Sequence, residues 1–192
     1  IVLTTIEFIL LLVGGMPFFD SLCHSLANAG TGGFSIKNAG IAAYGSPYIE
    51  IVITVFMILF SVNFNVFYLI ITGNILRAIK SEELWAFLGI IAFSIATITI
   101  NVSSMYESIG DAIRDSAFSV ATVISTTGFA TADFDKWPLF SQIMLVLLMF
   151  IGGCAGSTCG GLKISRVIIN RRICTSREKY YINRRRGSWY RR

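Results

Sequence analysis

The chain carries few charges, few prolines and almost no histidine. Of its 192 residues, 14% are charged, three are proline, and one, His24, is histidine. Hydrolysis and phosphoryl transfer usually depend on a Ser-His-Asp set, a pair of carboxylates or a phosphate-binding Gly-Lys loop, and the sequence shows none of these constellations. It therefore predicts a protein that is not an enzyme.

Cysteine is also scarce, and its spacing excludes the usual metal centre. The four cysteines are Cys23, Cys154, Cys159 and Cys174. No two of them form the Cys-x-x-Cys pair that is typical of a zinc site, and His24 is the only imidazole that could join them. Three of the four fall within predicted membrane segments, where a thiol packs as a small polarisable group. We expect them to be core residues.

Long apolar runs are what the chain has in place of charge. Hydrophobic residues make up 54% of the sequence, and a helix needs about 20 mostly apolar residues to cross a bilayer. Three runs approach or exceed that length, at residues 49–76, 84–105 and 138–169. A shorter run at residues 1–16 has no signal-peptide features, and we interpret it as the last part of a helix that begins before the sequence given. We therefore expect an all-α membrane protein and a fragment of a longer chain.

A short glycine-containing loop occurs twice. Residues 31–35 read TGGFS and residues 126–130, which lie 95 positions later, read TTGFA. Each loop follows a stretch that starts at Asp-Ser, and each precedes an apolar run that begins near a proline, Pro47 or Pro138. Such repetition defines the building unit of a fold. The predicted unit is a membrane helix, a short re-entrant helix, a loop and a second membrane helix, which is the plan of an ion-selective pore.

The chemistry of a dehydrated cation explains why such a loop contains glycine. Backbone carbonyls can replace the water of a potassium ion, and turning them to one axis requires backbone conformations that glycine adopts at low cost. Gly33 and Gly128 are the matched pair. We also expect Asp20 and Asp115 to cap the re-entrant helices, whose negative C-terminal ends would favour a cation. The simpler alternative is an ordinary turn between two helices. The predicted filter residues are Thr31, Gly32, Gly33, Phe34, Thr126, Thr127, Gly128 and Phe129.

The second membrane helix of each unit is interrupted. At an offset of 91, residues 61–65 (SVNFN) align with residues 152–156 (GGCAG). A run so rich in glycine is a poor helix, so it predicts a broken helix that lines the ion path, although close packing of small residues is an alternative. Lys163 follows, either held by a partner or extended to the inner surface. The predicted gate residues are Gly152, Gly153, Cys154, Ala155, Gly156, Ser157, Thr158, Cys159, Gly160 and Gly161.

The positive charge gathers at the end of the chain. Nine of the sixteen Lys and Arg residues lie in residues 171–192, against one acid, Glu178, so this tail carries about +8. Basic residues near the ends of spans favour the cytoplasm, so the connections at residues 17–46 and 107–137 should face outside. We interpret the tail as solvated or in contact with anionic lipid and expect no nucleic-acid partner.

Four segments carry a family resemblance: Asn28 to Ser35, Ser125 to Thr131, GGCAGST at residues 152–158 and GGLK at residues 160–163. Together they resemble the Trk/Ktr superfamily of potassium transporters. The resemblance covers residues 1–169 and implies four covalently joined units around one ion path. Residues 1–80 would be repeat two, with a truncated first helix, a pore loop at about 20–38 and a broken second helix at 48–79. Residues 84–170 would be repeat three, with a first helix at 84–105, a pore loop at about 111–133 and a broken helix at 138–170.

The same resemblance implies the function and the partners. It implies multi-pass insertion in the cytoplasmic (inner) membrane, potassium as the transported ion, and Na⁺ or H⁺ as the coupling ion if there is one. It also implies residues 152–161 as an intramembrane gate, a homodimer, and a cytosolic ring of nucleotide-binding regulatory subunits. Gly at both filter positions suggests potassium selectivity. The competing hypothesis is a membrane scaffold or regulatory subunit that does not conduct, in which the glycines serve helix packing.

Two features depart from the family pattern. Repeats one and four are absent, and the Arg-rich residues 171–192 differ from the connection expected before a fourth repeat. Because half a filter cannot fully coordinate an ion, either the native chain is longer or two chains assemble around one axis. We expect the former.

Overall fold

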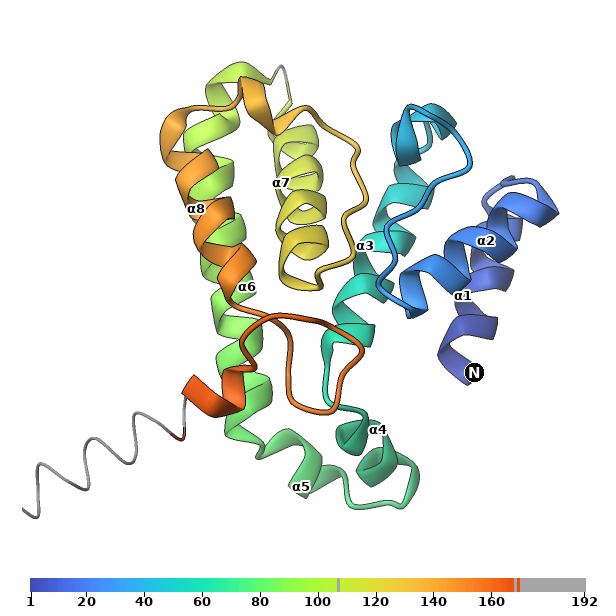
Figure 1. Cartoon of the computed structure of the whole chain (residues 1–192), viewed down its shortest axis with the longest axis vertical. Coiled ribbons are helices and arrows are strands. Elements are labelled where there is room, and N and C mark those ends of the chain that lie inside the picture. Colours follow the sequence, from blue (N-terminus) through green and yellow to red (C-terminus); the bar gives the residue numbers. More distant parts are fainter. Residues whose placement is uncertain (107, 168, 170–192) are drawn as a thin grey trace, which may run out of the picture.

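The structure is a computed structural model that describes residues 1–106, 108–167 and 169 (Figure 1). The described part is helical, and its only β-type pairing is one isolated parallel bridge between Ile151 and Leu162. The proposed cytoplasmic tail and Cys174 lie outside the described residues. The helices are α1 (Val2–Val13), α2 (Phe18–Ala29), η1 (Gly40–Tyr44), α3 (Pro47–Ser61), α4 (Phe64–Ile71), α5 (Ile75–Ile79), α6 (Glu82–Val102), η2 (Ser103–Met105), α7 (Ile109–Ile124), η3 (Phe134–Lys136) and α8 (Leu139–Phe150).

Two similar helical units make up the molecule. In the first, α1, α2 and α3 all pack against one another, and in the second α6, α7 and α8 do the same. The units meet where α3 packs against α7 (Figure 1). In each unit the middle helix leads into a glycine-containing loop that returns toward the start of the next helix. This is the predicted order of helix, pore loop and helix. We keep the numbering that the sequence resemblance implies and call the first unit repeat two and the second repeat three.

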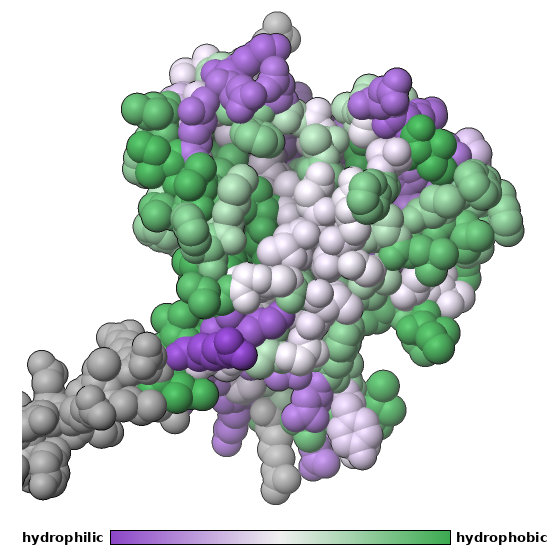
Figure 2. Space-filling view, in the orientation of Figure 1, coloured by the Kyte–Doolittle hydropathy of each residue, from purple (hydrophilic) through white to green (hydrophobic). Residues whose placement is uncertain are grey.

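Apolar side chains remain exposed along the outer helices. Figure 2 shows hydrophobic residues covering the sides of the molecule, while hydrophilic residues gather at its two ends. One helical stretch, Glu82–Met105, is long and apolar enough to cross a bilayer, and α3 with α4 forms a second candidate that is bent by 90°. The shorter helices α1 and α8 are also apolar. An apolar belt between two polar ends is the surface expected of a membrane protein, because lipid takes the place of a buried core.

The two pore helices, α2 and α7, end at equivalent positions but begin at different ones. Ala29 and Ile124, the last residues, are 95 positions apart, whereas α7 has 16 residues and α2 has 12. The N-cap predictions for Asp20 and Asp115 are wrong. Pro17 precedes α2, and α7 is capped by Ser108, whose side chain accepts a hydrogen bond from the Gly110 amide. The Asp-Ser signal failed because the helices begin further upstream.

Both second helices are interrupted, but in different ways. In repeat two, α3 ends at Ser61, Val62 and Asn63 are extended, and α4 starts in a new direction. The side chain of Asn63 caps α4 by accepting a hydrogen bond from the Asn65 amide at 2.9 Å. In repeat three, α8 ends at Phe150, and residues 151–163 form no helix. The repeat therefore places a sharp bend in one unit and a long loop in the other.

Candidate ion filter and gate loop

The two glycine-containing loops have the same unusual backbone conformation. Thr31 and Thr126 both have positive φ, at 50° and 56°, and are the only non-glycine residues in the described chain that do. Gly33 and Gly128 also have positive φ, at 68° and 86°. Threonine with positive φ is a genuine outlier because its side chain is β-branched. Such strain recurs at matched positions of the two loops, and it persists only where the surrounding structure holds the backbone in place.

The two loops touch one another through their backbones. A Cβ atom added to Gly33 would lie 2.0 Å from the carbonyl oxygen of Thr127, so no side chain fits at this position. At Gly128, by contrast, no described atom lies within 4 Å of such a Cβ. The structure therefore brings the predicted pair of loops side by side, with the carbonyl of Thr127 directed at Gly33.

Hydrogen bonds hold the loop of repeat three to its own pore helix. The hydroxyl of Thr122 donates to the carbonyl oxygen of Phe129 at 2.8 Å, and the hydroxyls of Ser125 and Thr127 lie 2.7 Å apart. Thr127 and Phe129 are buried. The Phe129 carbonyl therefore has a donor within its own repeat, unlike a carbonyl that faces an ion alone. In repeat two, Gly32 and Phe34 are exposed.

Residues 151–163, which we call the gate loop, lie against both filter loops. The amide of Gly160 donates to the hydroxyl of Thr126 at 2.7 Å, and the hydroxyl of Thr31 lies 3.4 Å from the carbonyl oxygen of Thr158. The two threonines with positive φ are therefore also the two filter residues that bond to the gate loop. One element contacts the matched position of both repeats.

The gate loop also fastens to the bend in repeat two. Because the chain leaves the helical path after Ser61, the carbonyl of this residue is free to accept a hydrogen bond, which comes from the Cys154 amide at 2.9 Å. The amide of Phe64 donates to the Gly156 carbonyl at 3.2 Å, and the thiol of Cys159 contacts the Ser61 hydroxyl at 3.0 Å. The bend in repeat two thus exposes backbone groups that form hydrogen bonds with the gate loop of repeat three.

Glu83, near the start of α6, joins these same two interruptions. Its Oε1 accepts a hydrogen bond from the Ala155 amide at 2.7 Å, and its Oε2 lies 3.4 Å from Nδ2 of Asn63. A carboxylate that accepts from a backbone amide makes one of the stronger hydrogen bonds in proteins. Glu83 was not predicted from the sequence, where it stands as an ordinary acid at a helix start.

Lys163 closes the other end of the gate loop. Its ammonium group donates to the carbonyl of Cys159 and lies 3.4 Å from the Ser157 hydroxyl, and its side chain is partly buried. Of the two expectations for this residue, a local partner is therefore what the structure shows. Its contacts satisfy acceptors of the loop that have no helical partner.

Glycine lets the gate loop fold back on itself. A Cβ at Gly152 would lie 1.9 Å from the Gly160 carbonyl oxygen, and the Gly152 amide donates to the Leu162 carbonyl at 3.0 Å. The two ends of the loop therefore pack backbone to backbone, which a larger residue would prevent. Cys154 and Cys159 of this loop are both buried.

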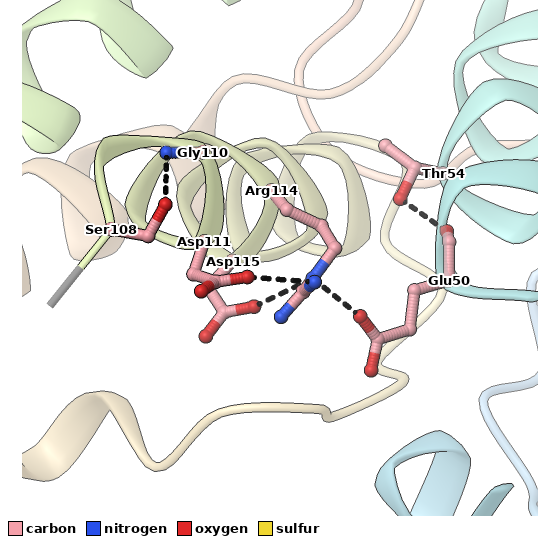
Figure 3. Close-up of polar contacts among 7 residues, drawn as sticks. All are labelled: Glu50, Thr54, Ser108, Gly110, Asp111, Arg114 and Asp115. Carbon is pink, nitrogen blue, oxygen red and sulfur yellow. Dashed lines mark hydrogen bonds and ion pairs between the residues drawn. The ribbon is translucent and has the colours of Figure 1, made fainter. Parts of the chain in front are cut away.

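An ion-pair cluster lies on the pore helix of repeat three (Figure 3). Arg114 of α7 contacts Glu50 of α3 at 2.8 Å, Asp111 at 2.9 Å and Asp115 at 3.5 Å. The pair with Glu50 links the two repeats, because α3 belongs to repeat two. Asp115, which was expected to cap a helix, instead shares this cation.

The corresponding end of repeat two has a different arrangement. The hydroxyl of Tyr44 donates to Asp20 at 2.6 Å, and His24 lies between the Asp20 carbonyl, at 2.7 Å, and the Ser35 hydroxyl, at 3.1 Å. Burial, and then the neighbouring carboxylate of Asp20, raise the pKa of Tyr44 well above its ordinary value. His24 is thus a satisfied structural residue, and no group of three metal-binding side chains occurs in the described chain.

Repeated units of helix, pore loop and helix, with apolar outer faces, define an all-α membrane protein of the pore-loop type. The family model for the cation transport protein TrkH matches residues 79–180. The chain belongs to the TrkH family.

Individual relatives agree with this assignment. The Trk system potassium uptake protein TrkH of Salmonella typhimurium is 33% identical over 158 residues, which are 81% of this chain and 33% of that protein. TrkG of Escherichia coli K12, also named a Trk system potassium uptake protein, is 34% identical over 160 residues, 82% of this chain and 33% of its own. These relatives are named as transport proteins, which agrees with the expectation that the chain is not an enzyme. The chain spans about a third of the length of the curated relatives that it matches.

A solved structure shares the fold. The crystal structure of the potassium transporter TrkH from Vibrio parahaemolyticus superimposes with a TM-score of 0.86 at 29% identity, and covers 95% of this chain and 40% of that one. The similarity extends over both repeats, because it includes almost the whole chain. It agrees with the membrane-embedded, repeated helical architecture predicted from the sequence.

Proposed function

We propose that the chain forms two adjacent sectors of a potassium uptake path, in which backbone carbonyls of the two filter loops face a dehydrated potassium ion. The observation that carries the proposal is the contact of the two loops at Gly33 and Thr127, with the gate loop bonded to Thr31 and Thr126. The names of the relatives support potassium as the ion. An inside-negative potential, worth about 2.3 kcal/mol per charge per 100 mV, would draw the cation inward.

The proposal extends to the location and the partners. It includes the inner membrane, with residues 171–192 on the cytoplasmic side, where the basic charge would follow the positive-inside rule. It also includes a homodimer and a cytosolic ring of nucleotide-binding regulatory subunits, as the family resemblance implies. If transport is coupled, Na⁺ or H⁺ is the coupling ion.

Gly128→Ser tests the filter. Because no described atom lies within 4 Å of a Cβ at this position, the serine fits sterically, and its effect falls on the loop conformation and its carbonyls. We expect normal expression from the complete reading frame but weaker discrimination between rubidium and sodium in uptake assays. Gly33→Ser should have the same effect on selectivity, accompanied by a folding defect from the contact with Thr127. Unchanged selectivity in a Gly128→Ser protein at normal expression would contradict the filter and favour the non-conducting scaffold.

Shortening the gate loop tests the gate separately. Amides of the gate loop donate hydrogen bonds to Ser61, Thr126 and Glu83, and these bonds hold the loop beside the filter, so deletion of residues 154–159 should raise the rubidium flux. The matched control is the single variant Cys159→Ser, which keeps the loop length and the contact with the Ser61 hydroxyl. An unchanged flux after the deletion would remove the gate and leave the filter standing.

A further inference from the structure

A buried polar pair lies behind the filter loop of repeat two. Glu7, in the middle of α1, and Asn28, next to last in α2, are both fully buried, at 0% exposure. Nδ2 of Asn28 donates to Oε1 of Glu7 at 2.6 Å. The carbonyl of Asn28 in turn accepts the amide of Thr31 at 3.1 Å, where the filter loop begins. The pair therefore connects the first helix to the first residue of the filter.

Each member of the pair leaves one buried acceptor without a donor. Oε2 of Glu7 and Oδ1 of Asn28 have no hydrogen-bond partner. No ion pair involves Glu7 in the described part of the chain. An ionised carboxylate that is buried without a cation is costly. One added hydrogen atom would supply the donor that both oxygens lack, because a protonated carboxyl donates through one oxygen and accepts through the other.

We propose that Glu7 is a proton-binding site: Oε2 carries a proton and donates a hydrogen bond to Oδ1 of Asn28, so that two hydrogen bonds join the acid and the amide. The step is a simple protonation, since the carboxylate gains one proton from water and becomes a neutral acid. The neutral pair then fixes Asn28, whose carbonyl holds the start of the filter loop.

The surroundings favour a proton over another ligand. Two unpartnered oxygens are too few for a hard metal cation, which takes six or more oxygen ligands. The helices packed against α1 are α2 and α3. None of their titratable side chains bonds to Glu7; they are Asp20, Cys23 and His24 on α2, and Tyr48 and Glu50 on α3. The carboxyl of Glu50 is instead paired with Arg114.

Repeat three provides an internal comparison. At the offset of 95, Val123 of α7 takes the position of Asn28 of α2. Val123 packs against an apolar cluster that includes Ile91 and Ile98 of α6. Apolar side chains are thus sufficient to pack the end of a pore helix in this fold. An ionisable residue inside a membrane segment is a functional site by default, so repeat two differs from repeat three by the capacity to hold a proton.

Infrared spectroscopy of the full-length protein in lipid tests the proposal. The wild-type spectrum minus the Glu7→Gln spectrum should show the carbonyl band of a protonated carboxyl at neutral pH, with the shift on transfer to D₂O that marks an exchangeable proton. Glutamine is a suitable reference because its amide can form the same two bonds with Asn28. Glu50→Gln is the matched control and should remove carboxylate bands only, since the partner of Glu50 is a cation.

The double variant Glu7→Val with Asn28→Val, which replaces the polar pair with apolar residues, is a second reference if the glutamine variant folds poorly. A difference spectrum with carboxylate bands and no acid band against either reference would overturn the proposal. The proton site depends on the packing of α1 and α2 and is measured without transport. A failed selectivity test of the filter would therefore leave this result unaffected, and the reverse also holds.

Discussion

Repeat two and repeat three share the backbone of the filter loop and differ in what surrounds it. Both place threonine and glycine with positive φ at matched positions. Below the filter, however, repeat two has a sharp bend after Ser61, and repeat three has a glycine-rich loop. The comparison indicates that the repeat preserves the part that would face the ion, while the flanking helices have diverged to hold that part from different sides.

The largest difference between the two repeats should be the loss of stability when each filter glycine is replaced by alanine. Gly33→Ala places a Cβ 2.0 Å from the Thr127 carbonyl oxygen, whereas Gly128→Ala meets no described atom within 4 Å. We expect Gly33→Ala to lower the free energy of unfolding by about 4 kcal/mol or more, in the range of severe core overpacking and strain. Gly128→Ala should cost about 1–2 kcal/mol, from the left-handed conformation alone.

Thermal unfolding of the two purified variants in one detergent measures this difference. Gly45→Ala is the control, because Gly45 has a positive φ of 56° in a loop outside the filter and meets nothing within 4 Å. It should behave as Gly128→Ala does. Equal destabilisation by Gly33→Ala and Gly128→Ala would show that the two loops are not in backbone contact.

Glu83 should control how firmly the gate loop is held to the bend of repeat two. Glu83→Ala leaves the Ala155 amide without its acceptor, and an unsatisfied partly buried group costs about 1–3 kcal/mol. A change of about 1.4 kcal/mol is a tenfold shift in an equilibrium, so we expect rubidium flux to rise by about tenfold. Glu83→Gln keeps an oxygen for the Ala155 amide and should raise the flux less.

Combining Glu83→Ala with the shortened gate loop distinguishes an effect on the loop from general destabilisation of the protein. If Glu83 acts through the loop, Glu83→Ala should add little flux once residues 154–159 are deleted. An equal increase in both backgrounds would mean that Glu83 acts elsewhere. Protein amount in the membrane, measured for every variant, normalises the flux.

The sequence predicted the elements whose signal is local and missed those that depend on packing. The repeated glycine loops and the apolar runs identified the helical units, because membrane length and glycine conformation are properties of short segments. The caps at Asp20 and Asp115 were wrong, since nothing local showed that α7 extends upstream to Ile109. Asp115 instead forms an ion pair with Arg114, which also pairs with Glu50 of the other repeat.

The partners of the gate loop were hidden for the same reason. The glycine-rich residues 152–161 could be recognised as non-helical from the sequence. The sequence did not show that amides of this segment donate hydrogen bonds to Glu83 and Ser61, which precede the donor residues by more than 70 positions. Long-range hydrogen bonds leave no periodic pattern. Glu7 did leave a signal, as the one charged residue of the apolar run at residues 1–16, and the rarity of charge inside membrane helices could have singled it out.

The smallest effect should come from the two threonines that join the filter to the gate loop. Thr126 accepts the Gly160 amide at 2.7 Å, within the normal range of a hydrogen bond, whereas the Thr31 hydroxyl is 3.4 Å from the Thr158 carbonyl. Valine keeps the β-branched shape and removes the hydroxyl. We expect Thr126→Val to destabilise the contact of the gate loop with the filter by about 1 kcal/mol and Thr31→Val to have a smaller effect.

Hydrogen exchange of the Gly160 amide gives a direct readout. Thr126→Val should speed its exchange by about fivefold, as follows from about 1 kcal/mol, and Thr31→Val should leave it nearly unchanged because Thr31 does not bond this amide. Faster exchange in both variants to the same extent would mean that the gate loop responds to the filter as a whole. The two repeats would then hold the loop equally, and the difference in hydrogen-bond length between them would have no energetic consequence.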